Sequence, residues 1–266
     1  MTVLVVTRPQ PQADEWVQKL RTLGQDALAL PLLRILPAPG HAEAVEQAWV
    51  AIAQKHYALV MFVSPNAVLQ FFSARPDGLP AWVDGVIAAA TGPGTVLALR
   101  SAGVPAACIA SPAESSPQFD AEALWQQHLL AMPWTGRRAL IVRGESGRDW
   151  LADTLRSQGA QVDLIAAYRR LGPDWGDAGF GVSWALVAAD PQQHAWLFSS
   201  SEAVRYLAQR LQGGDEAERR LWAMPAIATH ERIAETALRA GFRDVRPSRP
   251  DAQSIRFALQ RAHGRD

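Results

Sequence analysis

The stretch Ala139-Leu140-Ile141-Val142 is a short apolar run, which is typical of a strand buried on both faces of a sheet. A helix is predicted over residues 148–158, and Gly159 follows it at a place where helices commonly end in a residue with positive φ. A second strand is predicted over residues 161–167, with Tyr168 at its end. This part of the chain therefore predicts a strand–helix–strand unit.

The start of the chain repeats the same pattern. Val3-Leu4-Val5-Val6-Thr7-Arg8 opens the first copy, so that Arg8 aligns with Arg143 and Leu33 aligns with Tyr168. Two more pairs of segments match in the same order and at nearly the same offset. They are Phe62-Val63-Ser64-Pro65-Asn66-Ala67-Val68 with Phe198-Ser199-Ser200-Ser201-Glu202-Ala203-Val204, and Ala90-Thr91-Gly92 with Ala228-Thr229-His230. The 266 residues are therefore predicted to hold an internal duplication of two domain-sized copies.

Predicted strands and helices alternate along both copies, with short turns after the strands. This order predicts an α/β fold with parallel sheets. Segments rich in proline and glycine near residues 37–40 and 172–181 predict two crossings between domains. After the second crossing, the apolar run at residues 184–188 is predicted to be a strand.

Composition limits the classes of function. The chain is 48% hydrophobic, and its 26 basic residues balance 26 acidic ones, so no overall field attracts nucleic acid or an anionic membrane. Cys108 is the only cysteine, which rules out an internal disulfide and a thiolate metal cage. The sequence shows no signal-peptide pattern and no apolar run long enough for a membrane helix, so a cytoplasmic protein is expected.

Six polar turns follow predicted strands, and ligands of parallel sheets bind outside the carboxyl ends of strands. Each turn also begins a helix, whose free N–H groups and positive dipole end favour anions. Together the turns would suit a ligand with several carboxylates; the alternative is that their serines and threonines only cap their own helices. The turns are Arg8-Pro9, Ser64-Pro65-Asn66, Thr91-Gly92-Pro93, Arg143-Gly144, Ser199-Ser200-Ser201 and Thr229-His230.

Other chemistries have less support. The chain contains no Walker A loop, no GxGxxG and no GxSxG motif, and its six histidines show no ligand spacing. Tyr168 is the distinctive candidate, because it ends a strand where the other copy has Leu33. A phenol can donate a proton or a hydrogen bond at neutral pH. The alternative is a tyrosine that only packs at the sheet edge.

With these residues the chain resembles the uroporphyrinogen-III synthase family. Further matches are Thr91-Gly92-Pro93-Gly94-Thr95, Glu114-Ser115-Ser116, Val142-Arg143-Gly144 and Tyr168-Arg169. The likeness spans nearly the whole chain, and the order, spacing and twofold repetition of the motifs are specific together. There is one departure: His230 and Ile233 stand where the second copy of the family usually has glycine and threonine.

The resemblance implies two similar parallel-sheet α/β domains that are interleaved and joined by a two-strand connector. Residues 1–36 would join residues 173–266 in one domain, and residues 37–172 would form the other. The connector would lie near residues 34–40 and 168–176, with Tyr168 beside it and facing a cleft.

The resemblance also implies a reaction that needs no cofactor and no metal. Hydroxymethylbilane, a linear tetrapyrrole, would lose water and close to uroporphyrinogen III with inversion of its last ring. Tyr168 would be the catalytic residue, assisting the leaving hydroxyl. A monomer is implied, and a transient contact with the preceding deaminase is compatible with the pathway. The substrate-binding residues would be Arg8, Ser64, Gly92, Thr95, Arg143, Gly144, Ser199, Ser200, Thr229 and His230.

Two other hypotheses stay open at the level of sequence. One is a two-domain module, or an inactive homologue, that binds a carboxylate ligand without catalysis. The other is a sugar-nucleotide transferase with two α/β domains, which the chain's length and the missing phosphate loop disfavour.

Overall fold

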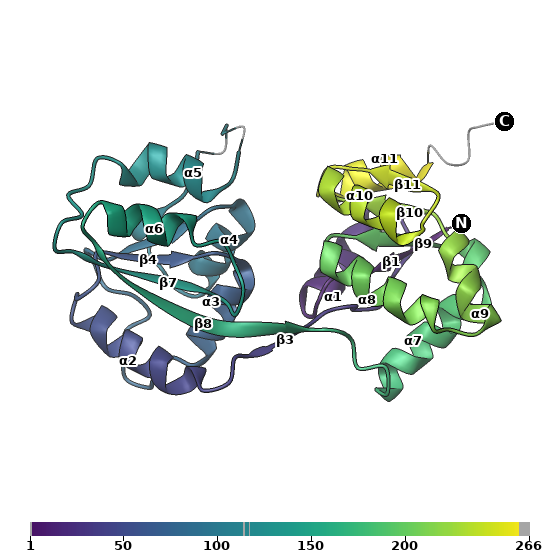
Figure 1. Ribbon diagram of the computed structural model, residues 1–266, viewed down its shortest axis with the longest axis horizontal. Helices are drawn as coiled ribbons and strands as arrows, with labels where there is room; N and C mark the ends of the chain where they lie inside the picture. Colours follow the sequence, from purple (N-terminus) through teal and green to yellow (C-terminus); the bar gives the residue numbers. More distant parts are fainter. Residues whose placement is uncertain (1, 114, 117, 261–266) are drawn as a thin grey trace. The chain divides into compact units, whose positions relative to one another are not determined.

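The computed structural model describes residues 2–113, 115, 116 and 118–260 (Figure 1). The chain divides into two compact units. Unit 1 combines Met1–Ile35 with Leu171–Asp266, and unit 2 is the continuous segment Leu36–Arg170. In the described part of the chain, no helix has the length and apolar character needed to cross a membrane.

In the described part of the chain, the sheet of unit 1 has five strands, and each strand is parallel to its neighbours. The N-terminal strand pairs on one side with the next strand along the chain and on the other side with a strand from the C-terminal segment. This second pairing joins the two chain segments of unit 1. In spatial order the strands are β11 (Val245–Pro247), β10 (Ala226–Ala228), β9 (His194–Phe198), β1 (Val3–Val6) and β2 (Ala27–Ala29).

Both faces of this sheet are covered by helices. In β1, Leu4 and Val6 belong to one apolar cluster and Val5 to the other, as expected when successive side chains point to opposite faces. The first cluster includes side chains of α1 (Gln12–Thr22) and α11 (Ala252–Gln260). Helices on the other face are α7 (Ala178–Ala189), α8 (Ser201–Gln212) and α10 (Glu231–Ala240), with α9 (Glu216–Arg219) nearby in the chain.

Among its described residues, unit 2 has a sheet of six strands, in which β4, β5, β6, β7 and β8 pair in parallel. In spatial order the strands are β3 (Arg34–Pro37), β8 (Gln161–Leu171), β7 (Arg138–Gly144), β4 (Leu59–Phe62), β5 (Ile87–Ala90) and β6 (Ile109–Ala110). The chain passes between the units within β3 and β8, which are neighbours in this sheet.

Unit 2 also packs apolar side chains on both faces of its sheet. Met61 and Ile141 lie in one cluster with residues of α6 (Trp150–Ser157), of α5 (Ala121–Leu124) and of the π-helix Trp125–Leu129. Phe62, one residue further along β4, packs instead against Phe71 and Trp82, with ring centroids 5.5 and 6.1 Å away. That side is covered by α2 (His41–Ala53) and α3 (Pro65–Ser73), while α4 (Pro93–Ser101) follows β5.

The predicted α/β class with two duplicated parallel-sheet units is confirmed, but one predicted element is wrong. Residues 184–188 are not a strand; they belong to α7, whose sequence Ala178–Ala189 carries no charged residue. Asp177 begins this helix, because its carboxylate accepts a hydrogen bond from the Phe180 N–H at 2.8 Å. A short apolar run cannot distinguish a strand from a buried helix by periodicity alone, which explains the error.

Candidate active site

The predicted polar turns all lie at the carboxyl ends of strands. In unit 2 two of them follow β4 and β5, whereas Arg143-Gly144, predicted as a turn, forms the last two residues of β7 and pairs with β8. Tyr168 lies near the end of β8, and these four strands are consecutive in the sheet. In unit 1 they follow β1, β9 and β10, which are also consecutive. Because these strands are parallel to their neighbours, the turns of each unit share one edge of its sheet.

Tyr168 lies at this edge of unit 2, packed on the backbone of the next strand. A bulge shifts the register of β7 and β8 so that Gly144 pairs with Tyr168. The Tyr168 residue is 0% exposed. A Cβ atom on Gly144 would lie 3.0 Å from Cε2 and 3.1 Å from Cζ of the ring. A side chain at this position would therefore require the ring to shift, which favours glycine here.

The Tyr168 hydroxyl contacts two polar side chains of unit 2. Its oxygen lies 3.0 Å from Ser64 Oγ and accepts a hydrogen bond from Arg170 Nη2 at 3.0 Å. The Arg170 guanidinium also lies over the ring, with Cζ 5.4 Å from its centroid. The hydroxyl is thus held between a neutral hydroxyl group and a cation.

Ser64 has a second, structural role that the sequence predicted. It is the N-cap of α3, where its Oγ accepts a hydrogen bond from the Ala67 N–H at 3.2 Å, and Pro65 occupies the first helical position. The cap fixes the position of the side chain beside Tyr168. Capping and contact with the phenol are therefore compatible functions of one oxygen.

Three other predicted residues of unit 2 lie at the same sheet edge but do not contact the phenol oxygen. Arg143 forms an ion pair with Asp149 and donates a weak hydrogen bond to Gly144 O at 3.4 Å. Gly92 is the N-cap of α4 with extended backbone. The Thr95 residue, in the first turn of α4, is only 4% exposed. Thr95 is therefore placed to support the turn from inside.

In unit 1, Arg8 packs on an aromatic ring, with its Cζ 4.7 Å from the Trp16 centroid. Burial lowers the pKa of the Arg8 guanidinium from its ordinary value, and the nearby Glu15 carboxylate acts in the opposite direction. Just before Arg8, the Thr7 hydroxyl donates a hydrogen bond to Leu197 O at 2.7 Å. This bond joins the ends of β1 and β9.

The remaining predicted residues of unit 1 mostly serve their own helices. Ser200 is the N-cap of α8 and accepts from the Glu202 N–H at 3.1 Å, while Ser199 before it is half-buried. His230 is the N-cap of α10, where Nδ1 accepts from the Arg232 N–H at 3.1 Å. Nδ1 is therefore the unprotonated nitrogen in this arrangement. Thr229 is 9% exposed.

Ile233, where the sequence departs from the family pattern, lies in the apolar core and is 7% exposed. It does not belong to the polar edge. Ile233 therefore contributes to the packing of unit 1, and the imidazole of His230 provides a side-chain cap for the helix.

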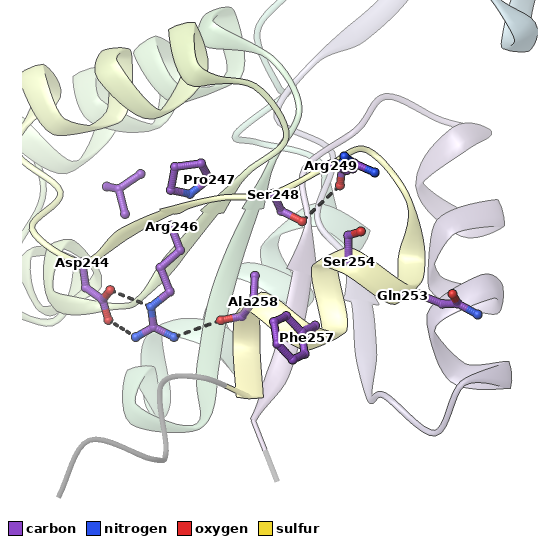
Figure 2. Close-up of a pocket in the computed structure, with 10 residues that line it drawn as sticks. Asp244, Arg246, Pro247, Ser248, Arg249, Gln253, Ser254, Phe257 and Ala258 are labelled. Atoms are coloured by element: carbon purple, nitrogen blue, oxygen red, sulfur yellow. Dashed lines mark hydrogen bonds and ion pairs between the residues drawn. The ribbon is translucent and has the colours of Figure 1, made fainter. Parts of the chain in front are cut away.

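A cavity of about 1070 Å³ lies elsewhere in unit 1, between β11 and α11. Figure 2 shows Arg246 in this cavity, held by an ion pair with Asp244 and by a 3.5 Å hydrogen bond to Ala258 O. No predicted site residue lines this cavity. A second cavity of about 580 Å³ lies at the amino ends of β4, β7 and β8.

No cluster of three or more histidine, cysteine or acidic side chains in the described residues could hold a metal ion. The polar edge of unit 2 carries a buried phenol, a serine hydroxyl and guanidinium groups. Such a set can bind carboxylates and donate a proton.

Sequence reasoning missed Arg170. A usable signal existed, because side chains two residues apart on a strand point to the same face, and Arg170 follows Tyr168 at that spacing. What the sequence does not contain is the direction of the guanidinium, which turns back to the phenol oxygen.

The structure defines a protein of two duplicated α/β units, each with polar groups along the carboxyl edge of its parallel sheet. A model of the family described as uroporphyrinogen-III synthase HemD matches residues 14–256. The chain therefore belongs to the uroporphyrinogen-III synthase family.

Relatives of known sequence agree with this assignment. The chain is 27% identical over 264 residues to uroporphyrinogen-III synthase of Escherichia coli K12, covering 97% of this chain and 99% of that protein. It is 27% identical over 181 residues to uroporphyrinogen-III synthase of Proteus mirabilis, covering 68% of this chain and 86% of that protein.

The similarity to solved structures supports the fold. A mutant uroporphyrinogen III synthase from the extremely thermophilic bacterium Thermus thermophilus has a TM-score of 0.56 at 17% identity, with 100% of both chains covered. Uroporphyrinogen-III synthetase from Helicobacter pylori 26695 has a TM-score of 0.57 at 13% identity, with 98% of this chain and 99% of that chain covered.

Proposed function

We propose that this protein is an active uroporphyrinogen-III synthase. It would convert hydroxymethylbilane to uroporphyrinogen III, with loss of water and inversion of the last pyrrole ring. The observation that supports this best is the hydrogen-bonded cluster of Ser64, Tyr168 and Arg170 at the carboxyl edge of unit 2. This cluster supports the proposal because it combines an acid and a cation at the edge where parallel sheets commonly bind ligands.

The first chemical step needs a proton for the leaving hydroxyl group of the substrate. Tyr168 is the source of that proton in this proposal, and such general acid catalysis typically accelerates a step by about 10²–10⁴-fold. The resulting azafulvene attacks the last ring at its substituted position to give a spiro intermediate, which then closes to the inverted product.

Binding must also steer the reaction, because the free substrate closes unaided to the unrotated isomer I. The helix N-termini after β4, β5, β9 and β10 offer N–H groups to substrate carboxylates, and Arg8 and Arg143 offer guanidinium groups. Holding the chain ends in one geometry favours the productive closure over the uncatalysed one. We also propose a monomeric cytoplasmic enzyme that takes its substrate from the preceding deaminase.

The direct test is the isomer composition of the product. Hydroxymethylbilane is generated with a deaminase, the protein is added, and the oxidised porphyrins are separated by chromatography. Predominantly isomer III is expected. Isomer I alone, from protein that circular dichroism shows to be folded, would refute the proposal and favour a carboxylate-binding module without catalysis.

Tyr168→Phe tests the role of the phenol in the same assay. Formation of isomer III should slow by about 10²–10⁴-fold, because only the acidic proton is lost. Tyr57→Phe is the matched control, since Tyr57 lies in the same unit and donates its hydroxyl to Asp163 at 2.8 Å. Equal rates for wild type and Tyr168→Phe would remove Tyr168 from the mechanism.

A further inference from the structure

The two neighbours of the Tyr168 hydroxyl determine where its proton points. Arg170 can only donate, so the phenol oxygen accepts from Nη2 at 3.0 Å. In the described part of the chain, Ser64 Oγ at 3.0 Å is the remaining partner. Since Tyr168 has no exposed surface, its proton would lack an acceptor unless it pointed to Ser64. The phenol therefore donates to Ser64.

Ser64 can accept this bond and still have a proton to give. Its oxygen accepts from the Ala67 N–H and from the phenol, which uses both acceptor positions of a hydroxyl group. Its own proton is then free to donate outward. Ser64 is half-buried, whereas Tyr168 is fully buried, so the serine is the member of the pair that a substrate can contact.

A second arginine–tyrosine pair in unit 2 shows what is unusual about Arg170. Arg138 lies over the Tyr57 ring at 5.0 Å, but it donates to the Asp163 carboxylate at 2.8 Å, which also accepts from the Tyr57 hydroxyl. Arg170 has no such carboxylate: among the described residues it forms no ion pair, and its hydrogen bond goes to the phenol oxygen itself.

We propose that Arg170, Tyr168 and Ser64 form a proton-donating chain, an inference that rests on the proposed function. Ser64 gives its proton to the leaving hydroxyl of the substrate, and Tyr168 gives its proton to Ser64 in the same step. The C–O bond breaks with both electrons on oxygen, so water leaves, and the pyrrole nitrogen stabilises the cation that remains. Arg170 stabilises the phenolate.

The proton balance closes within one turnover. When the macrocycle forms, the attacked pyrrole loses a proton as it becomes aromatic again. That proton returns through Ser64 to the Tyr168 phenolate, which restores the starting state. Arg170 keeps its charge throughout and acts only by positioning and electrostatic stabilisation, because an arginine does not deprotonate under these conditions.

Three single variants and one double variant test the chain. Ser64→Ala should reduce kcat for isomer III about tenfold or more, and Ser64→Thr should keep most of the activity, because the relay needs a hydroxyl group. Arg170→Ala should also reduce kcat about tenfold, with KM nearly unchanged, as expected for losing a hydrogen bond that involves a charged group. The double variant Tyr168→Phe/Arg170→Ala should have the same kcat as Tyr168→Phe alone, since Arg170 acts through the phenol oxygen.

The proton path itself has a separate readout. In mixtures of H₂O and D₂O, a plot of the wild-type rate against the deuterium fraction should be curved, because two protons move in one step. Ser64→Ala should give a straight line. Guanidinium ions added to Arg170→Ala should restore activity, but they should not restore Tyr168→Phe/Arg170→Ala.

Two controls separate this chemistry from loss of structure. Arg138→Ala removes an arginine from a tyrosine ring elsewhere in unit 2 and should leave the rate unchanged. Asp120→Ala removes another helix cap, in which the Asp120 carboxylate accepts from the Ala123 N–H at 2.8 Å, and it measures the effect of a lost cap alone.

The outcomes are distinct. A wild-type protein that yields only isomer I refutes the proposed function, and the proton chain falls with it. An active wild type with a fully active Ser64→Ala variant refutes the relay alone. If the reductions of kcat in Tyr168→Phe and Arg170→Ala multiply in the double variant, Arg170 binds substrate instead of stabilising the phenolate. An effect of Arg170→Ala on KM alone would show the same.

Discussion

Replacing Gly144 with alanine would place a methyl group against the Tyr168 ring. The new Cβ would lie 3.0 Å from Cε2 and 3.1 Å from Cζ. Ordinary carbon–carbon contacts are about 3.5–4.0 Å, so the ring would have to retreat by about 0.5 Å. Because Tyr168 is fully buried, such a shift moves the ring against other protein atoms.

This retreat affects both stability and the hydroxyl group. Forcing a methyl group into a packed site costs about 1–3 kcal/mol of unfolding free energy. The hydrogen bonds of the hydroxyl to Ser64 and Arg170 are each 3.0 Å long. A shift of about 0.5 Å would lengthen them to about 3.5 Å, where little hydrogen bonding remains. Formation of isomer III should then slow by at least about tenfold, a part of the total effect of general acid catalysis.

Urea unfolding and the isomer assay measure the two effects on the same protein. Gly147→Ala is the matched control in the same turn, because its Cβ would have its nearest contact at 3.5 Å, from Arg143 Nε. Gly147→Ala should leave both the unfolding free energy and the rate of isomer III formation nearly unchanged. A Gly144→Ala variant with wild-type stability and wild-type rate would refute the claim that the ring is held against this backbone.

Two further predictions concern stability. Burial, together with the hydrogen bond to Asp163, raises the pKa of Tyr57 to about 12, above its ordinary value near 10.0. The neutral phenol therefore contributes to the unfolding free energy. This contribution is complete below about pH 10 and is lost as the pH rises toward about 12. Urea unfolding at about pH 8 and about pH 11 measures this effect. Between these pH values the unfolding free energy should fall more for the wild type than for Tyr57→Phe, and equal decreases would contradict the prediction. Ile233→Thr should lower the unfolding free energy by about 1–3 kcal/mol, because it buries a hydroxyl group in the core of unit 1, and unchanged urea unfolding would show that the position tolerates a polar group.

The repeat in the sequence was sufficient to predict the class of fold. The matched segments predicted duplicated α/β units, and the alternation of strands and helices predicted parallel sheets, as the structure has them. Ser64 was predicted as a helix cap, and its bond to the Ala67 N–H confirms that role. These features depend on local patterns, which sequence carries directly.

The features that sequence could not provide depend on pairing between distant segments. The contact of Tyr168 with Gly144 requires the bulge between β7 and β8, and a shift of one residue in a strand moves every side chain to the other face. The bond from Arg170 to the phenol depends on side-chain direction as well. The false strand at residues 184–188 has a different origin, since an apolar run suits both a strand and the buried part of α7.

The division of unit 1 into two chain segments has a consequence for synthesis on the ribosome. Unit 2, Leu36–Arg170, is continuous and has its own core, so it can fold as soon as it has emerged. Strand β1 is made long before its neighbour β9 (His194–Phe198). The nascent N-terminal segment therefore waits with one strand edge unpaired while the middle of the protein folds. A pause in translation before residue 194 would prolong that wait and expose the apolar β1 strand to aggregation or to a chaperone.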